Sequence, residues 1–364
     1  MGLRVVIAGG GTGGHLFPGI AVARELLARR PGTEVSFAGT ARGIEARVLP
    51  REGFELDLIR SGGIKGKSIG GRARGAALLP ASVWDAWNIV ARRRPHLVIG
   101  VGGYSSGPVV LMAALRGVPT MVLEQNAVPG LTNRLLAPFV RAAAVTFAST
   151  ASYFKGKAFV SGNPVRPEFL QSVGPLTGAG ADEQSSIASI LVFGGSQGAH
   201  AINVAMVEAA PELAAGPPVR LTHQTGERDV EMVRSAYRRA GISAEVEPFL
   251  FDMGERLRHA DVIVCRAGAT TLAEITAAGR AAILIPLPTA TDDHQRKNAE
   301  ALAATGAADL LLQSEATGSV LARRVQALAG NREARTRMEQ AARALARPDA
   351  AKVIVDRVLE LVGN

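Results

Sequence analysis

Short apolar runs alternate with amphipathic helical patterns along nearly the whole chain. In the first half the runs predict strands at residues 4–8, 34–38, 55–59, 97–100, 120–124, 143–146 and 158–160. After residue 189 the scheme restarts, with predicted strands at 190–193, 220–223, 244–248, 262–265 and 282–286. Strands separated by helices are typical of parallel sheets, so the pattern predicts an α/β protein.

Two turn-rich segments interrupt this alternation near the middle of the chain. Residues 162–167 read Gly-Asn-Pro-Val-Arg-Pro, and residues 172–189 are rich in Gly, Ser and Ala, so we expect a domain boundary here. The chain on either side opens with a strand, a glycine turn and a helix. We therefore expect two related doubly wound domains that face each other across a deep cleft. The tail, 349–361, predicts a helix with an apolar stripe at Val355, Val358, Leu359 and Val362.

The composition fits a globular protein with two domains. The chain has 364 residues, of which 47% are hydrophobic and 20% charged. Cys265 is the only cysteine, which excludes an internal disulfide and favours a reducing compartment. The start shows no signal-peptide pattern. The uncharged stretch 97–115 is long enough to span a membrane, but glycines and a proline fill its centre, so we expect a strand, a glycine loop and a helix.

The charge is positive and unevenly distributed. A formal net charge of +9 implies an anionic partner or surface, or simply a solvated basic face. Asp85 is the only acid between residues 60 and 94. The basic residues there are Arg60, Lys65, Lys67, Arg72, Arg74, Arg92, Arg93 and Arg94. Aromatic residues make up 4% of the chain, which disfavours single-stranded nucleic acid as a partner.

Residues 9–15, Gly-Gly-Gly-Thr-Gly-Gly-His, lie between a predicted strand and a predicted helix. Such a turn directs backbone N–H groups and a positive helix end at an anion, usually a phosphate. Gly9, Gly11 and Gly14 match the dinucleotide pattern G-x-G-x-x-G. A dinucleotide site also needs an acid at the end of the second strand, and residues 35–40 provide none, which argues against NAD.

Further glycine loops follow predicted strands at 100–108, 194–198 and 266–271. One such loop can be plain turn chemistry, but four at one sheet edge favour a ligand site. Thr270 and Thr271 can cap a helix that begins there. Glu274, expected on its first turn, either stabilises the helix end or accepts hydrogen bonds from ribose hydroxyls. Residues 292–299, Asp-Asp-His-Gln-Arg-Lys-Asn-Ala, suit sugar hydroxyls or form a polar helix start.

Other catalytic patterns are weaker. His15 lies where a helix N-terminus lowers an imidazole pKa, so it is either a general base or a structural histidine. The histidines show no paired metal-ligand spacing. Gly66-Lys67-Ser68 ends like a Walker loop but lacks its first glycine, so ATP hydrolysis is not expected. The letters of a serine nucleophile elbow occur at residues 194–198, where phosphate binding is the better explanation.

Several motifs together carry a resemblance to one family. They are residues 9–18, 102–108, 124–126 with 130–133, 162–166, 194–199, and 265–271 with Glu274. In this order, and over essentially the whole chain, they are similar to those of the MurG family, the UDP-N-acetylglucosamine:lipid I N-acetylglucosaminyltransferases of peptidoglycan synthesis. The resemblance implies a GT-B fold and inverting transfer of GlcNAc from UDP-GlcNAc to the C4 hydroxyl of MurNAc in lipid I, with no metal or other cofactor.

The resemblance also implies what each domain binds. Residues 1–163, with a C-terminal helix at 347–364, would face the acceptor and the membrane, and residues 164–346 would bind UDP-GlcNAc. By matching position, the donor contacts are Thr12, Gly13, Gly14, Asn126, Arg166, Ser196, Ala269, Thr270, Thr271, Leu272, Ala273, Glu274 and Gln295. The backbone of Leu250 would read uracil, and Ser196 with the second glycine loop would hold the diphosphate of the donor. The first glycine loop and Tyr104 would face the acceptor, and His15 would activate the acceptor hydroxyl.

Two positions depart from the family pattern. Leu123 stands where many members have a histidine, and His294 replaces the first glutamine of a Gln-Gln pair. The basic region precedes a predicted helix with an apolar stripe of Leu79, Val83, Trp87 and Val90, while Trp84 lies off the stripe. Basic and apolar residues together suit docking on an anionic leaflet, although the stripe can equally be core. We therefore expect a peripheral enzyme on the cytoplasmic face of the plasma membrane, with cell-wall and division proteins as partners.

The alternative hypotheses are another GT-B enzyme acting on UDP-GlcNAc, such as an epimerase-like or lipid-glycosylating relative, and a nucleotide-binding or basic nucleic-acid-binding module. The last would show steep salt dependence on oligonucleotides, whereas the family resemblance predicts no nucleic-acid partner.

Overall fold

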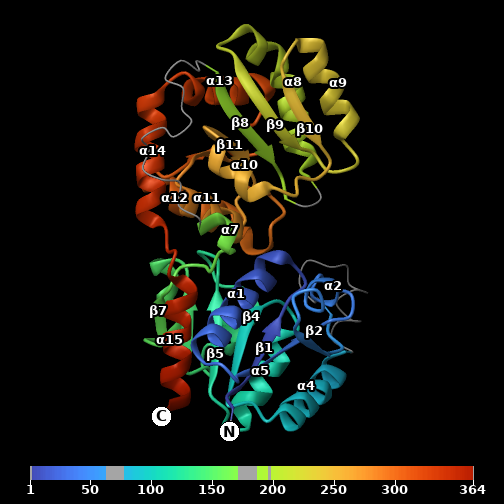
Figure 1. Cartoon of the computed structure of the whole chain (residues 1–364), viewed down its shortest axis with the longest axis vertical. Helices are drawn as coiled ribbons and strands as arrows, with labels where there is room; N and C mark the ends of the chain where they lie inside the picture. Colours follow the sequence, from blue (N-terminus) through green and yellow to red (C-terminus); the bar gives the residue numbers. More distant parts are fainter. Residues whose placement is uncertain (1, 63–77, 171–186, 196–197, 364) are drawn as a thin grey trace. The chain divides into compact units, whose positions relative to one another are not determined.

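The chain forms two compact units, each built on one parallel sheet (Figure 1). The structure, a computed structural model, describes residues 2–62, 78–170, 187–195 and 198–363. The first unit is Met1–Arg166 with Arg347–Asn364, and the second is Pro167–Ala346. The boundary between the two units thus follows Arg166, whereas the sequence analysis placed it after residue 163.

The sheet of the first unit has seven parallel strands in the order β3-β2-β1-β4-β5-β6-β7. Their bounds are β1 Arg4–Gly9, β2 Glu34–Gly39, β3 Glu55–Leu58, β4 Leu97–Gly102, β5 Thr120–Glu124, β6 Ala142–Val145 and β7 Ala158–Val160. Strand β1 pairs with both β2 and β4, so the chain reverses its direction of travel across the sheet at this point. A reversal of this kind is where α/β sheets bind ligands.

Helices cover both faces of this sheet. They are α1 Gly13–Arg29, α2 Glu45–Val48, α4 Leu79–Arg93, α5 Ser106–Leu115, α6 Leu131–Leu136, η1 Ala148–Phe154 and α15 Ala350–Gly363. Successive side chains of a strand point to opposite faces. Val5 and Ile7 of β1 therefore join one core with α1 and α15, while Val6 and Ala8 join the other with α4 and α5. Burial on both faces explains why the strands are continuous apolar runs.

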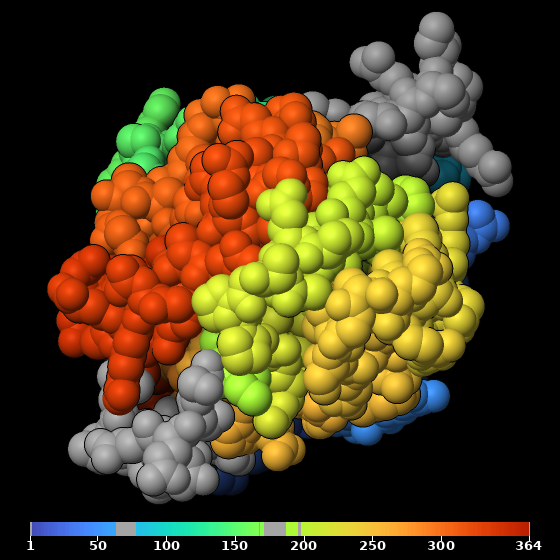
Figure 2. Space-filling model, turned by 90° about the horizontal axis from the view of Figure 1, so that it is seen from above, coloured from blue at the N-terminus to red at the C-terminus, as the bar shows by residue number. Residues whose placement is uncertain are grey.

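The second unit repeats this scheme with six strands in the order β10-β9-β8-β11-β12-β13. The strands are β8 Ala188–Phe193, β9 Val219–Gln224, β10 Ala244–Glu247, β11 Val262–Cys265, β12 Ala281–Leu284 and β13 Asp309–Leu310. The helices are α7 Pro167–Leu170, α8 His200–Ala215, α9 Val230–Ala240, α10 Met253–His259, α11 Ala269–Ala278, η2 Thr291–Asp293, α12 His294–Ala303, α13 Gly318–Ala329 and α14 Arg332–Leu345. Helix α8 packs against both α9 and α13, and Figure 2 shows these segments side by side on the surface.

The elements follow the predicted pattern closely. Each predicted strand is present, with bounds that differ by at most two residues. Strand β13 was not predicted, because two residues leave no periodicity to detect. The stretch 97–115 forms β4, a glycine loop and α5, as expected. Among the residues that the structure describes, no helix combines the length and apolarity that a membrane crossing requires.

The C-terminal helix α15 is part of the core of the first unit. Val355 and Val358 of the predicted stripe are fully buried, and Leu359 and Val362 are partly buried against the same cluster. Ile354, which lies outside that stripe, is also fully buried there. The helix packs on α1, so a helix near the end of the sequence belongs to the same unit as a helix near its start.

We predict that Ile354→Ala lowers the free energy of unfolding of the first unit by about 2–5 kcal/mol, because it leaves a cavity in a closely packed core. The exposed neighbour Lys352 is the control, since Lys352→Ala removes no buried contact and is expected to change stability by less than about 0.5 kcal/mol. Urea denaturation measures both. Equal effects of the two substitutions would show that α15 does not stabilise the unit.

Candidate functional site

The predicted residues of the first unit collect at one edge of its sheet. Thr12, Gly13, Gly14 and His15 follow β1, Tyr104 follows β4, and Asn126 follows β5. These three strands are neighbours in the sheet and all parallel, so their carboxyl ends lie side by side. Parallel topology thus brings together residues that are more than a hundred positions apart in the sequence.

The first glycine loop packs directly on the loop that follows β4. Gly9, Gly10 and Gly11 all have positive φ, a conformation that favours glycine. The Gly10 N–H donates to Gly102 O at 3.4 Å. A Cβ on Gly102 would come within 2.7 Å of His15 Nδ1, so the imidazole lies against the Gly102 backbone. This contact fixes where the candidate base sits, at the first turn of α1.

A buried carboxylate lies beneath the same loop. Glu45 is fully buried, and its Oε2 accepts a hydrogen bond from Gly11 N at 2.7 Å. Its Oε1 accepts from Thr40 N at 2.8 Å and from Thr40 Oγ1 at 2.9 Å. The N–H groups of Gly10 and Gly11 are therefore used inside the unit. For Gly10 and Gly11 this corrects the expectation that the loop directs its N–H groups outward at a phosphate.

A second buried carboxylate organises the loop after β5. Glu124 Oε1 accepts from the backbone N and the Nδ2 of Asn126, at 3.0 and 3.2 Å. Glu124 Oε2 accepts from Gly130 N at 3.0 Å and Asn133 Nδ2 at 2.9 Å. Four hydrogen bonds to one side chain hold Asn126 in a defined position at the edge of the sheet.

Arg166, another predicted site residue, lies against α1. Its guanidinium lies 5.1 Å from the centroid of the Phe17 ring, on α1, within the range of a cation–π contact. Tyr104 is 47% exposed, so its ring is open to solvent and to a substrate.

In the second unit the predicted residues again follow strand ends. Leu250 lies after β10, helix α11 begins after β11, and Gln295 lies after β12. Ser196, in the glycine loop after β8, lies outside the described residues. All of these strands belong to one parallel sheet, so the residues share its carboxyl edge.

Gln224 links two of these loops. It is the last residue of β9 and is 2% exposed. Its Nε2 donates to Gly195 O at 2.8 Å, and its Oε1 accepts from Leu250 N at 3.2 Å. One buried amide therefore fixes the second glycine loop and the Leu250 loop relative to each other.

Helix α11 begins one residue before the predicted threonine caps. Its N-cap is Gly268, without a side-chain cap, and Thr270 and Thr271 lie in its first turn. The expected threonine cap is therefore wrong, and so is the place of Glu274, which lies on the second turn and is 7% exposed. Ala269, Leu272 and Ala273 belong to the same two turns. The N-cap glycine has no side chain to accept from the first N–H groups of the helix, so the positive end of α11 lies at the carboxyl edge of the sheet.

Gln295 and its neighbours shape the next loop. Gln295 Oε1 accepts from Leu287 N at 3.0 Å, and His294 Nδ1 lies 2.7 Å from Thr291 O. Asp292 and Asp293 adopt positive φ, which strains a non-glycine backbone and is common near functional sites.

A buried polar network supports the second glycine loop from below. Asn203 Nδ2 donates to Thr225 O at 2.9 Å and to Asp229 Oδ2 at 2.8 Å. His223 Nε2 lies 3.0 Å from Asn203 Oδ1, and His223 Nδ1 lies 2.8 Å from Tyr237 Oη. Burial lowers the pKa of His223 to about 3, so the ring is neutral at physiological pH.

These supporting residues were not predicted. Glu45, Glu124, Gln224 and Asn203 are polar or charged yet buried. The available signal was weak: His223 falls on the buried face of β9 that Val219 and Leu221 share, and a polar residue in such a place needs a partner. The sequence does not say which partner.

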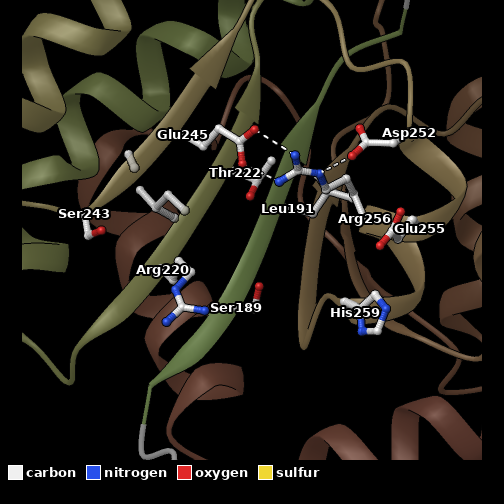
Figure 3. Close-up of a pocket in the computed structure, with 12 residues that line it drawn as sticks. Ser189, Leu191, Arg220, Thr222, Ser243, Glu245, Asp252, Glu255, Arg256 and His259 are labelled. Carbon is white, nitrogen blue, oxygen red and sulfur yellow. Dashed lines mark hydrogen bonds and ion pairs between the residues drawn. The ribbon is translucent and has the colours of Figure 1, made fainter. Parts of the chain in front are cut away.

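A groove in the second unit lies away from the predicted residues (Figure 3). It has a volume of about 520 Å³ and is lined by residues of β8, β9, β10 and α10, among them Arg220 and His259. Arg256 spans its rim, with Nη2 2.8 Å from Glu245 Oε1 and Nε 2.8 Å from Asp252 Oδ2 (Figure 3). The hydrogen bond from Arg256 lowers the pKa of Asp252.

Within the ranges that the structure describes, no three His, Cys, Asp or Glu side chains are grouped so that they could hold a metal ion.

Two parallel-sheet units with glycine loops at their carboxyl edges fit the GT-B fold, which glycosyltransferases share with other enzymes. The glycosyltransferase family 28 N-terminal domain matches residues 5–145, and the glycosyltransferase family 28 C-terminal domain matches residues 189–354. These matches and the two parallel sheets confirm the predicted fold class, α/β with a GT-B fold.

Full-length relatives narrow the class. A "UDP-N-acetylglucosamine--N-acetylmuramyl-(pentapeptide) pyrophosphoryl-undecaprenol N-acetylglucosamine transferase" of Anaeromyxobacter sp. (strain K) is 47% identical over 99% of this chain and 93% of its own. The protein of the same name from Geotalea uraniireducens (strain Rf4) is 49% identical over 98% of both chains. The crystal structure of Acinetobacter baumannii MurG matches with a TM-score of 0.81 and 33% identity, covering 98% of this chain and 99% of that one.

The chain therefore belongs to the MurG family, and it is a hexosyltransferase. The glycosyltransferase of kitacinnamycin, at 17% identity and a TM-score of 0.75 over the whole of both chains, shares the fold.

We predict that the second unit loses stability as the pH falls below 6.5. The pKa of His223 is about 3 when folded and 6.5 as the ordinary value, so between these pH values only the unfolded chain binds the proton. The neutral ring makes its full contribution to the free energy of unfolding above pH 6.5, and this contribution decreases by about 2 kcal/mol by pH 5. Urea denaturation across this range should show a flatter pH dependence for His223→Gln. An equal slope in both proteins would contradict the assignment.

Proposed function

We propose that this enzyme transfers GlcNAc from UDP-GlcNAc to the C4 hydroxyl of MurNAc in undecaprenyl-diphosphate-linked MurNAc-pentapeptide, lipid I, with inversion, and so forms lipid II and UDP. The observation that carries the proposal is the identity of 47% with a relative of that name over 99% of the chain. The candidate residues at both sheet edges support it.

The second unit would hold the donor. The uncapped N-terminus of α11 suits the two phosphates, because its N–H groups and its dipole both favour negative charge. Glu274, on the second turn, would accept from ribose hydroxyls, and the backbone of Leu250 would read uracil. Gln295 would contact the sugar, and Ser196 would contact the diphosphate.

The first unit would hold the acceptor. The C4 oxygen attacks C1 of GlcNAc while the bond from C1 to the UDP oxygen breaks, which inverts the configuration at C1. We assign His15 as the base that takes the hydroxyl proton, since its ring is fixed against Gly102 at the sheet edge. Hydrogen-bond donors and a helix end stabilise the charge on the leaving UDP. Thr12, Gly13, Gly14, Tyr104, Asn126 and Arg166 would surround the reacting groups.

The two departures from the family pattern constrain the roles. Leu123 is buried in β5 at 2% exposure, so its side chain serves the core and takes no part in acceptor binding. His294 bonds back to its own loop, which leaves Gln295 as the sugar contact from this pair.

We predict that His15→Ala lowers kcat by about 10²–10⁴-fold, the usual contribution of a general base, and changes the Kd of UDP by less than twofold. Turnover of a lipid I analogue and calorimetry with UDP measure the two quantities. The exposed His259, remote from the candidate site, provides the control His259→Ala. Near-normal turnover of His15→Ala would remove His15 from the mechanism, and a wild-type protein without turnover would overturn the proposed function.

We also propose that the first unit docks peripherally on the anionic, cytoplasmic leaflet of the plasma membrane. Leu79, Val83, Trp84 and Trp87 of α4 are 40–63% exposed, and Leu115 of α5 is 64% exposed. Arg116 lies 4.5 Å from the Trp87 ring centroid, which adds a cation to this apolar patch. Val90 is an exception to the predicted stripe, because it is 1% exposed and belongs to the core.

Lys65, Lys67, Arg72 and Arg74, which the sequence places beside this patch, lie outside the described residues. Cell-wall and division proteins stay predicted partners.

We predict that Trp84→Ser with Trp87→Ser weakens binding to vesicles that contain anionic lipid by about tenfold or more, because two aromatic side chains no longer enter the interface. Vesicle co-sedimentation measures the binding. Met232→Ser, which changes an exposed apolar residue of the second unit, is the matched control. Unchanged binding of the double variant would place the membrane contact elsewhere.

A further inference from the structure

The loop that contains Leu250 is held by the end of β9. Gln224, the last residue of that strand, accepts at its Oε1 from Leu250 N at 3.2 Å. Gly226 N donates to Pro248 O at 3.1 Å, although both residues lie beyond the ends of their strands. The pairing of β9 with β10 thus continues past the sheet, and the Leu250 loop is a fixed extension of it.

The same side chain holds the second glycine loop. Gln224 Nε2 donates to Gly195 O at 2.8 Å, and this carbonyl also accepts from Gly198 N at 2.9 Å. Gly198 has positive φ, and a Cβ there would lie 1.9 Å from Thr225 O, so the loop packs against the end of β9. Gly195 directly precedes Ser196, the predicted diphosphate contact. Gln224 therefore joins the predicted uracil loop to the predicted diphosphate loop.

The chemistry of an amide explains how one side chain serves both loops. An amide carries a donor and an acceptor side by side, and the groups that face Gln224 are a carbonyl oxygen and a backbone N–H. The side chain is 2% exposed, so a lost hydrogen bond leaves a buried polar group without a partner. A carboxylate at this position keeps the bond from Leu250 N but cannot donate to Gly195 O.

We propose that Gln224 is a positioning residue that sets the spacing between the nucleoside and the diphosphate in the donor site. Its amide is satisfied within the unit, so it acts through the backbones of Gly195 and Leu250. When the two loops are fixed relative to each other, a ligand that carries both groups at the matching separation gains from both contacts at once. The inference rests on the proposed function for the identity of the donor.

The main test is Gln224→Glu, which keeps the size of the side chain and its bond from Leu250 N. At pH 8 the introduced carboxylate presents an oxygen to Gly195 O, so the glycine loop loses its donor. We expect the Kd of UDP to rise about tenfold or more, and the Kd of uridine, which has no phosphate, to change by less than twofold. Calorimetry measures UDP, and displacement of UDP measures uridine.

A second variant separates the lost hydrogen bond from the added charge. Gln224→Met has about the same length and no charge, so it cannot repel a diphosphate. We expect it to raise the Kd of UDP about tenfold or more as well, and to weaken uridine too, because both loops lose their hydrogen bonds.

The pH profile separates positioning from a general loss of structure. Burial beside a carbonyl oxygen raises the pKa of the introduced carboxyl, and the protonated form donates again. Between pH 8 and pH 6, Gln224→Glu should therefore regain UDP affinity about fivefold relative to the wild type, whereas Gln224→Met should regain none. Native groups that titrate in this range act on all three proteins, so the ratio to the wild type at each pH is the readout. His223, the preceding residue, titrates below it.

Glu339→Gln is the control for stability. Glu339 is 6% exposed on α14, and it lies 3.9 Å from Arg280, which follows the C-terminal end of α11. Breaking this buried pair should lower the Tm and leave the Kd of UDP within twofold of the wild type.

The wild type offers a test that needs no variant. Opening of either loop breaks a bond to the shared amide, so uridine alone should slow amide exchange at Gly198 as well as at residues 249–251. Protection confined to 249–251 would contradict the coupling.

The inference is also overturned by unchanged UDP affinity in folded Gln224→Glu or Gln224→Met, by equal losses of uridine and UDP affinity in Gln224→Glu, or by no recovery of that variant at pH 6. A wild type that binds UDP but does not turn over lipid I would instead contradict the proposed function.

Discussion

The parallel arrangement of strands is the constraint on which the candidate site depends. Each strand must be followed by a crossover to the same end of the sheet, so all the loops that follow strands gather at one edge. This gathers His15, Tyr104 and Asn126 in the first unit, and Leu250 and α11 in the second. Buried side chains next to the loops hold them in place. Glu45, Glu124 and Gln224 each satisfy backbone groups of a loop from below.

Similar glycine patterns stand in different surroundings in the two units. The first loop encloses a carboxylate of its own unit, whereas the second unit presents the uncapped end of α11 at its edge. A transferase of this kind must hold a charged leaving group firmly and a neutral nucleophile in line with it.

Much of the fold could be predicted from periodicity, because strands buried on both faces are continuous apolar runs. The loops could be predicted as well, since glycine at a strand end is a local signal. The hydrogen bonds that hold these loops could not be predicted. Gly11 and its acceptor Glu45 are 34 residues apart, and Gln224 and Leu250 are 26 apart, and no local pattern pairs them. The cap of α11 was misplaced because threonine and glycine both suit that position. Helical spacing left open whether the stripe of α4 is exposed or core, and the structure buries Val90 while it exposes Leu79, Val83 and Trp87.

The central claim is that the carboxyl edge of the second sheet holds the UDP part of the donor, and that the N–H groups of Gly10 and Gly11 take no part in binding it. Amide hydrogen exchange with and without UDP measures this directly, residue by residue. The account predicts that UDP slows exchange at residues 249–251 and in the first turn of α11, and leaves Gly10 and Gly11 unchanged, since their N–H groups are already bonded within the unit. Protection at Gly10 and Gly11 with none in the second unit would contradict it.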